Sequence, residues 1–250
     1  MQGKRFRGTS RGMSDYFIKA GYEHGGENLT LEKQPGDYWS PSRIWLNRFD
    51  QIAVYRHAAH VIQTQGYTTA LDVGCGVGWK TMHVLAPAAC VTGVDQESVV
   101  TRLRQYYPKG NFVAVNLEQA DDSGLGRFDL ALTANVIEHM ANPDRLLDFL
   151  RQHVRKNGRV IVGTPERDLR RGRSNNRPTK AYNIREWNRE ELARYLDDRG
   201  FEIETHDIVP GFRFGGSWKM LRERWRLLRK RVPIRYIQCV TCRVRSSAVA

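Results

Sequence analysis

The chain has 250 residues, of which 40% are hydrophobic and 10% aromatic, a composition typical of a folded globular protein and not of a disordered one. Its formal net charge of +13 favours anionic partners. No apolar run approaches the ~20 residues that span a bilayer, and no apolar stretch of a secretory signal follows the basic residues 1–11. We therefore expect a cytoplasmic protein, and its four cysteines, which stay reduced in that compartment, agree.

The first 41 residues contain several aromatic side chains and glycines ahead of the first helical pattern. We expect residues 1–41 to form a cover, which either packs on the core or closes as a lid over a ligand. Residues 42–250 are expected to form one domain. Apolar residues at helical spacing predict a helix over Ser42–Thr64, with Pro41 suited to its first turn.

The stretch LDVGCGVG, Leu71–Gly78, joins a short apolar strand to a loop with glycine at every second position. Gly74, Gly76 and Gly78 lack a Cβ atom, so the backbone can turn sharply and its N–H groups can approach a ligand closely. Because Trp79 follows Gly78, the spacing departs from the G-x-G-x-x-G pattern of dinucleotide-binding enzymes and argues against a dehydrogenase. Taken alone, the loop could also be an ordinary tight turn between a strand and a helix.

The next two strand patterns end in polar residues. The segment VTGVDQES predicts a second strand that ends at Asp95, whose carboxylate can accept two hydrogen bonds from a ribose diol. The alternating segment Asn111–Glu118 predicts a third strand that ends at Asn116 and Leu117, an amide and an apolar wall that could bracket an adenine.

A fourth strand pattern begins at Phe128, ends near Thr133 and continues into a helix that carries Glu138 and His139. His139 is the candidate general base, because the ordinary pKa of histidine, ~6.5, lies close to neutrality. A structural role for His139 at the start of the helix is the alternative. Glu138 could orient the imidazole or join a metal site.

The remaining elements alternate in the same way. A helix pattern begins at Asn142 and Pro143, and Gly158 is expected to end it as a C-terminal glycine cap. Strand patterns over 158–166, 201–209 and 234–245 and a helix over Trp187–Arg199 complete the chain. We predict an α/β fold with a doubly wound, mostly parallel, seven-stranded sheet that binds its ligand at the carboxyl ends of the strands.

The last strand pattern contains a C-x-x-C pair, Cys239 and Cys242. Strand alternation puts residues three apart on opposite faces of a sheet, and no second pair or neighbouring histidine completes a ligand set. We predict no metal site.

Two insertions interrupt the common pattern on the substrate side, residues 167–189 and 211–233. The first is rich in arginine, and a guanidinium cluster suits a phosphate, a nucleotide-sugar diphosphate or a uronate, unless the loop is only solvated. In the second, a basic helix with an apolar stripe over 216–233 could pack on its own sheet, pair with a partner helix or lie on an anionic membrane surface. The candidate substrate residues are Arg167, Arg170, Arg171, Tyr182 and Arg185.

The motifs LDVGCGVG, VDQES and VIEHM together resemble those of class I S-adenosylmethionine-dependent methyltransferases that act on small molecules and in glycan pathways. The resemblance is close over Ala70–Glu166 and looser over Asn183–Phe201, where relatives commonly carry histidine at the position of Asn183. It implies a Rossmann-like fold with S-adenosylmethionine as cofactor, and an aspartate usually stands where this chain has Asn116. The cofactor residues that it implies are Asp72, Gly74, Cys75, Gly76 and Gly78 for the loop, Asp95 and Gln96 for the ribose, Asn116 and Leu117 for the adenine, and Asn135.

The sequence therefore predicts a methyltransferase that modifies a hydroxyl group of an anionic small molecule or sugar or glycan intermediate. An RNA or protein methyltransferase is the second hypothesis, because the positive charge could follow a phosphate backbone. A non-catalytic scaffold that binds S-adenosylmethionine is the third.

Overall fold

The computed structural model describes residues 39–119, 124–174, 178, 183–211, 225 and 236–245. Most of the predicted cover, Tyr182 and nearly all of the basic insertion 211–233 lie outside these residues. The division into a cover and a domain, and the roles of the basic helix, stay predictions.

Seven strands of the described chain form one sheet in the order β3-β2-β1-β4-β5-β7-β6. Strands β1 to β5 pair in parallel, whereas β7 is antiparallel to both β5 and β6. The predicted doubly wound, mostly parallel sheet is confirmed. The strands are β1 Thr69–Val73, β2 Cys90–Asp95, β3 Asn111–Ala114, β4 Phe128–Ala134, β5 Val154–Pro165, β6 Phe201–Pro210 and β7 Tyr236–Val244.

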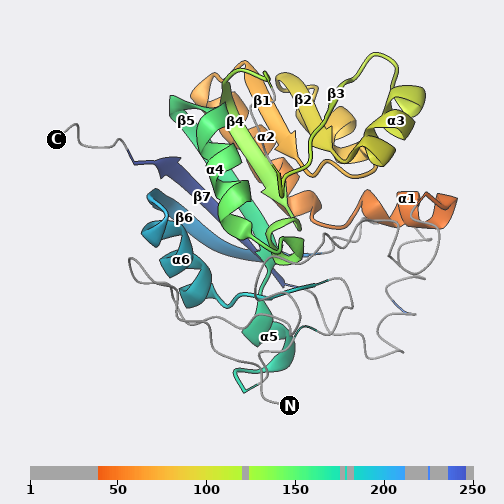
Figure 1. Cartoon of the computed structure of the whole chain (residues 1–250). Helices are drawn as coiled ribbons and strands as arrows, with labels where there is room; N and C mark the ends of the chain where they lie inside the picture. Colours follow the sequence, from red (N-terminus) through yellow and green to blue (C-terminus); the bar gives the residue numbers. More distant parts are fainter. Residues whose placement is uncertain are drawn as a thin grey trace.

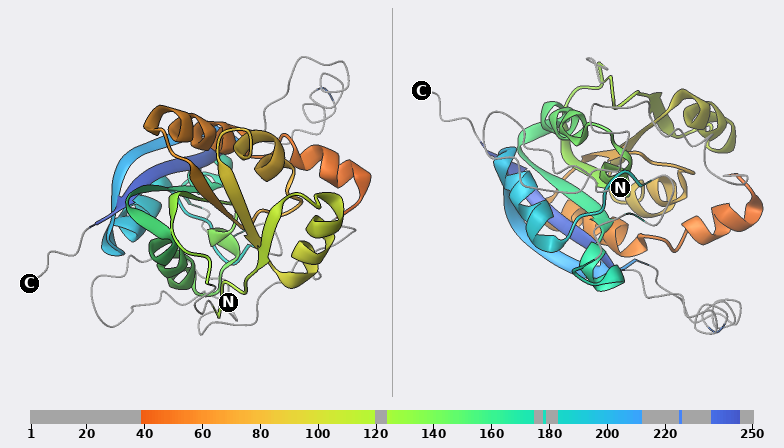
Figure 2. Two further views of the ribbon diagram at one scale, coloured as in Figure 1. Left: turned by 90° about the horizontal axis from the view of Figure 1, so that it is seen from above. Right: turned by 60° about the horizontal axis from the view of Figure 1, so that its bottom comes forward.

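Helices cover both faces of the sheet, with α4 in front of it and α2 behind it in Figure 1. Seen from above, α2 and α4 lie on opposite sides of the strands (Figure 2). In the described chain the α-helices are α1 Pro41–Asn47, α2 Ile52–Gln65, α3 Glu97–Tyr106, α4 Pro143–His153, α5 Arg167–Arg171 and α6 Arg189–Asp198. A π-helical turn, η2 Thr81–Leu85, and a 3-10 turn, η3 Ile137–His139, follow β1 and β4.

Alternating residues of the central strands belong to two large apolar clusters, one on each face of the sheet, and a third, smaller cluster lies around α3 and β3. The cluster on the α4 and α6 side includes Leu71, Val162 and Cys242. The cluster on the α2 side includes Ala70, Ile161 and Cys239. The prediction that the two cysteines of the C-x-x-C pair lie on opposite faces is therefore confirmed.

The single helix predicted over Ser42–Thr64 is wrong, because the chain forms two helices there, α1 and α2. Gln51 separates them with a left-handed backbone at φ 59°, and its N–H donates to the carbonyl of Gly211 at 2.7 Å. The apolar spacing of the sequence runs across this break, although among the described side chains of the two helices only those of α2 include fully buried ones.

The expected glycine cap at Gly158 is also wrong. Helix α4 ends at His153 and β5 begins at the next residue, so Gly158 lies within the strand. There, a Cβ atom would stand 2.5 Å from the carbonyl oxygen of Asp129, so the glycine serves a close approach of two strands.

Candidate cofactor and acceptor site

The glycine loop occupies the carboxyl end of β1, the edge toward which the arrowheads of β1 and β4 point in Figure 1. Gly74, Gly76 and Gly78 have φ values of 76°, 57° and 70°, a left-handed backbone that favours glycine. A Cβ atom on Gly74 would lie 2.3 Å from Cγ2 of Val136, so the loop touches the segment that follows β4. The predicted loop and the predicted His139 segment are thus brought together.

The amide groups of this loop are used within the protein. The N–H groups of Gly74 and Cys75 donate to the carbonyl of Val94 at 2.8 and 3.1 Å, and that of Gly78 donates to the carbonyl of Cys75 at 3.1 Å. The expectation that these N–H groups bind the ligand is therefore corrected. A loop without these donors suits a cation better than a phosphate, which needs converging N–H groups.

Asp95 lies at the tip of β2, beside the loop, as predicted. One carboxylate oxygen accepts the N–H of Gly76 and the other that of Gln96, each at 2.8 Å. Burial raises the pKa of the Asp95 carboxyl, and the two backbone hydrogen bonds oppose this shift. Each carboxylate oxygen has a second lone pair, so the group can also accept hydrogen bonds from a diol.

The predicted adenine residues follow β3 at the same edge, where the N–H of Val115 donates to the carbonyl of Asp95 at 2.9 Å. Leu117 is half-buried against the core, which suits an apolar wall. Asn116 is exposed, and its side-chain oxygen accepts the N–H of Glu118 at 3.1 Å in a local turn. The contact of Asn116 with the adenine stays a prediction.

Asp72 is 0% exposed, so in this structure it has no surface that a ligand could touch. Its carboxylate accepts the hydroxyl of Tyr55 at 3.1 Å and that of Thr81 at 2.6 Å. Burial raises the pKa of Asp72 to about 6, against the effect of these hydrogen bonds. The direct cofactor contact implied for Asp72 is corrected to a supporting position beneath the loop.

The segment after β4 turns sharply at Asn135, which has a left-handed backbone at φ 57°. Among the described residues, no hydrogen bond reaches the buried Oδ1 of Asn135. An unpaired buried acceptor suits a cationic donor such as an ammonium group. The role of Asn135 as a cofactor residue stays a prediction, which this acceptor supports.

Glu138 and His139 lie in η3, at the carboxyl end of β4. Glu138 is fully buried, and its Oε2 accepts the hydroxyl of Thr164 on β5 at 3.0 Å. His139 is 27% exposed, with its Nε2 4.0 Å from Oε1 of Glu138. The structure thus pairs a partly exposed imidazole with a buried carboxylate behind it.

Arg167 and Arg185 do not form the predicted anion site. Arg185 is 1% exposed, and its guanidinium donates to the carbonyls of Met140 and Ala141 at 3.3 and 2.9 Å. Arg167 is 4% exposed and pairs with Asp168 and Glu191 at 3.0 and 2.7 Å. Both predictions are corrected, because each guanidinium is buried and donates to acceptors within the protein. The side chains of Arg170 and Arg171, in α5, and the whole of Tyr182 lie outside the described part of the chain.

Arg185 belongs to a buried strap, residues 183–187, that crosses the ends of β4, β5 and β7. The N–H of Ile184 donates to the carbonyl of Glu138 at 2.8 Å, and Gln238 on β7 donates to the carbonyl of Trp187 at 2.9 Å. Asn183 is also buried in this strap and donates to Glu186 at 2.7 Å. The strap therefore holds η3 in place through its hydrogen bonds to the backbone of Glu138.

Sequence reasoning missed Glu118, which joins the end of β3 to the start of α4. Its carboxylate accepts the N–H groups of Ala141 and Asn142 at 2.6 and 3.3 Å. It also missed Tyr55 and Thr81 beneath the loop. The only local signal for Thr81 is a hydroxyl three residues after Gly78, and nothing in the helix pattern marks Tyr55.

These groups fit an adenosyl sulfonium cofactor. The described site combines the carboxylate of Asp95 with an unpaired acceptor at Asn135, and the N–H groups of the three loop glycines are engaged within the protein. No group of three or more histidine, cysteine or acidic residues in the described chain could hold a metal ion. None of the described helices has the length and apolarity that a membrane span requires.

The fold and this site define a class I S-adenosylmethionine-dependent methyltransferase. A family profile described as a methyltransferase domain matches residues 43–206, and the chain belongs to that family. Its cofactor is S-adenosylmethionine.

Two relatives show how far the similarity extends. A probable S-adenosylmethionine-dependent methyltransferase of Mycolicibacterium smegmatis is 29% identical over 167 residues, which cover 64% of this chain and 60% of that protein. The ubiquinone biosynthesis O-methyltransferase of Agrobacterium fabrum is 28% identical over 221 residues, 76% of this chain and 84% of that protein. The chain thus spans less than two thirds of the first relative.

Two solved structures share the fold. The 1,6-didemethyltoxoflavin-N1-methyltransferase of Burkholderia thailandensis, solved with 1,6-didemethyltoxoflavin and S-adenosylhomocysteine, aligns with a TM-score of 0.58 at 23% identity over 84% of both chains. The magnesium protoporphyrin IX methyltransferase of Synechocystis, solved with S-adenosylmethionine, aligns with a TM-score of 0.53 at 18% identity over 84% of this chain and 87% of that one.

Proposed function

We propose that this protein methylates a hydroxyl group of a small-molecule acceptor. The observation that carries the proposal is the pair His139 and Glu138, which lies beside the glycine loop at the carboxyl edge of the sheet. An alcohol is a weak nucleophile and must lose its proton as it attacks, so an O-methyltransferase gains from a base at this place. The ubiquinone biosynthesis O-methyltransferases among the relatives support the same type of acceptor.

The residues take the following roles in this proposal. Asp95 accepts hydrogen bonds from the ribose hydroxyls of the cofactor, and Oδ1 of Asn135 accepts one from its amino group. Gly74 lets the loop pack closely against Val136 at the edge where the cofactor would bind. Leu117 and the amide of Asn116 contact the adenine.

His139 takes the proton of the acceptor hydroxyl on its imidazole. The buried carboxylate of Glu138, 4.0 Å from Nε2, stabilises the positive charge that forms on the ring. Thr164 fixes the other oxygen of Glu138, so that the carboxylate stays oriented toward the imidazole. When bound, the cofactor supplies an activated methyl group, so these residues need only align the acceptor and hold its proton.

The net charge of +13 favours an anionic acceptor. Arg167 and Arg185 do not supply that preference, since both are buried and paired. The proposed preference for an anionic acceptor therefore rests on the net positive charge of the whole protein.

A cofactor-binding and turnover experiment tests the proposal. Asp95→Ala should weaken S-adenosylmethionine binding, measured by calorimetry, by about 1–3 kcal/mol, because charge-assisted hydrogen bonds are lost. Asp148→Ala, which removes an exposed carboxylate on α4 remote from the loop, is the matched control and should leave affinity unchanged.

His139→Ala should abolish most formation of S-adenosylhomocysteine with hydroxylated acceptors while it leaves cofactor affinity nearly unchanged. Full turnover in this variant would show that another group, or none, takes the proton. Tight cofactor binding without turnover on hydroxylated acceptors, sugars or RNA would favour a non-catalytic scaffold.

A further inference from the structure

The buried carboxylate of Asp72 lies on β1 immediately before the glycine loop, and the proposed mechanism does not use it. Two hydroxyl groups hold it: Tyr55 on α2 donates to Oδ1 at 3.1 Å, and Thr81 on η2 donates to Oδ2 at 2.6 Å. Both donors are themselves almost completely buried. A carboxylate is rarely buried without a salt bridge, so this arrangement calls for a physical reason.

The local backbone is shaped to bring Thr81 to this place. A π-helical turn begins at Thr81, whose carbonyl accepts the N–H of Ala86 at 2.9 Å, five residues on. Such wide turns are rare and are frequent at functional sites. On the other side, Tyr55 belongs to the apolar cluster that fixes α2 against β1.

Lys80 is the positive charge nearest to this carboxylate in sequence, and it is buried too. Its ammonium group donates to the carbonyl of Asn47 at 3.0 Å and lies 5.1 Å from the ring centre of Tyr55. It forms no ion pair with Asp72, so it lowers the pKa of Asp72 only through space.

The other titratable groups around Asp72 are Asp95 on β2, whose charge raises the pKa of Asp72, and the thiol of Cys75 in the loop. Burial raises the pKa of that thiol well above its ordinary value, so Cys75 stays neutral. Asp72, beneath the loop, therefore carries a negative charge that two hydroxyl groups stabilise, and among the described residues no cation contacts it directly.

We infer that Tyr55 and Thr81 are positioning residues that keep Asp72 ionised beneath the glycine loop, so that its charge strengthens binding of the cationic cofactor relative to that of the neutral demethylated product. The inference rests on the proposed placement of the cofactor over this loop. The sulfonium of S-adenosylmethionine carries a positive charge that the thioether of S-adenosylhomocysteine lacks. A buried negative charge acts strongly at short range, because little water screens it. It would favour binding of the cofactor and release of the product.

The affinities for S-adenosylmethionine and S-adenosylhomocysteine, measured by calorimetry between about pH 5 and pH 8, test this inference. In the natural protein the affinity for S-adenosylmethionine should fall as the pH drops through the pKa of Asp72, about 6, while that for S-adenosylhomocysteine changes much less. Tyr55→Phe and Thr81→Val should move this fall to higher pH. At pH 7 each variant should bind S-adenosylmethionine more weakly, by about twofold if the pKa of Asp72 rises by one unit and by about tenfold if it rises by two.

Matched variants separate this effect from a loss of packing. Thr81→Ser keeps the hydroxyl and should restore the natural ratio of the two affinities. Tyr67→Phe removes a hydroxyl that contacts Asn157 and Arg159 near the opposite end of the sheet, and it should change neither affinity. Asp72→Asn should remove the part of the pH dependence that Tyr55→Phe displaces. The part that remains comes from other groups of the site, such as Asp95, whose pKa is also raised by burial.

Three outcomes are distinct. If S-adenosylmethionine does not bind the natural protein at all, the cofactor placement itself fails. If it binds with the same preference over S-adenosylhomocysteine in the natural protein and in Thr81→Val at every pH, only the inference about Tyr55 and Thr81 is overturned. A loss of preference in Thr81→Val that Thr81→Ser reverses supports it.

Discussion

At the scale of single residues, the ionised carboxylate of Asp72, which we infer to act on the bound cofactor, lowers the stability of the fold. Burial raises the pKa of Asp72 to about 6, whereas an unfolded chain has an aspartate pKa of about 3.9. Between these values the native state keeps a proton that the unfolded state has released. The free energy of unfolding therefore decreases as the pH rises from about 4 to about 6, and the ionised group remains destabilising at pH 7.

Asp72→Asn should remove this decrease. Two units of pKa correspond to roughly 3 kcal/mol, an upper limit for the gain in the free energy of unfolding at pH 7, since the amide cannot serve both hydroxyl groups equally well. Urea unfolding at several pH values between about 4 and 8 measures the difference between the variant and the natural protein. The same comparison cancels His57 and His206, whose pKa values are lowered by burial. Identical pH profiles would contradict the assignment.

The residues that sequence reasoning placed correctly owe their positions to local constraints. Gly74 and Asp95 each lie at the end of a predicted strand. The glycine that permits a sharp turn and the acidic residue that ends a strand can both be recognised from a few neighbouring residues of the sequence. Arg185 could not be placed in this way, because its acceptors are carbonyls 44 and 45 residues earlier in the chain. An arginine that looks solvent-exposed in a polar segment is here a buried donor. Tyr55 escaped prediction for the same reason, since its hydroxyl meets Asp72 only after α2 packs on β1.

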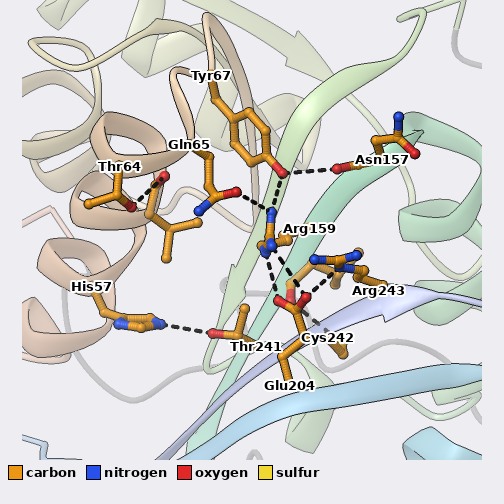
Figure 3. A network of polar contacts seen from close by, with 12 residues as sticks. His57, Thr64, Gln65, Tyr67, Asn157, Arg159, Glu204, Thr241, Cys242 and Arg243 are labelled. Carbon is orange, nitrogen blue, oxygen red and sulfur yellow. Dashed lines mark hydrogen bonds and ion pairs between the residues drawn. The ribbon is translucent and has the colours of Figure 1, made fainter.

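At the scale of elements, the candidate ligand site and a large polar network lie at different ends of the strands. Figure 3 shows a polar network centred on Arg159, which lies in the first half of β5. Its guanidinium donates to Glu204 on β6 at 2.6 Å, to Gln65 at the end of α2 at 2.9 Å and to the hydroxyl of Tyr67 at 2.6 Å. Arg243 on β7 pairs with the same Glu204. One side chain thereby ties α2 and β5 to the antiparallel strands.

Arg159→Met should lower the free energy of unfolding by about 1–3 kcal/mol, because hydrogen bonds of a largely buried charged group are lost. Affinity for S-adenosylmethionine should not change, since the network lies away from the glycine loop. Denaturant unfolding and calorimetry measure the two quantities. Arg245→Met, which breaks an exposed ion pair with Asp197, is the control and should alter stability by less than about 1 kcal/mol. Weaker cofactor binding in Arg159→Met would show that the two ends of the strands are coupled.

The order of strands and helices could be predicted because apolar periodicity is a local property. The break between α1 and α2 could not, since the amide of Gln51 is bonded to Gly211, a residue far along the chain. The prediction for Gly158 is wrong for a related reason. A glycine after a helix predicts a C-terminal cap, but here β4 approaches β5 so closely that no side chain fits at this position. Long-range contacts overrode the local preference in both places.

At the scale of the whole molecule, the net positive charge predicts binding of polyanions such as RNA, whereas the candidate site predicts a small-molecule acceptor. The net charge of +13 attracts any polyanion through phosphate or sulfate contacts, whatever the enzyme methylates. Several arginines of the described chain are already matched internally, among them Arg159, Arg167 and Arg199. The charge alone therefore gives no reason to assign RNA as the substrate.

Salt dependence separates non-specific attraction from recognition at the site. Binding of a single-stranded RNA should weaken steeply between about 50 and 200 mM salt, because each phosphate contact releases counterions. Affinity for S-adenosylmethionine should change much less over the same range, since a buried charge and hydrogen bonds in a partly enclosed site are poorly screened. Filter binding and calorimetry in the same buffers measure both. Methyl transfer to RNA that persists at the higher salt and exceeds transfer to hydroxylated small molecules would instead make RNA the acceptor, and the pair His139 and Glu138 would then need another role.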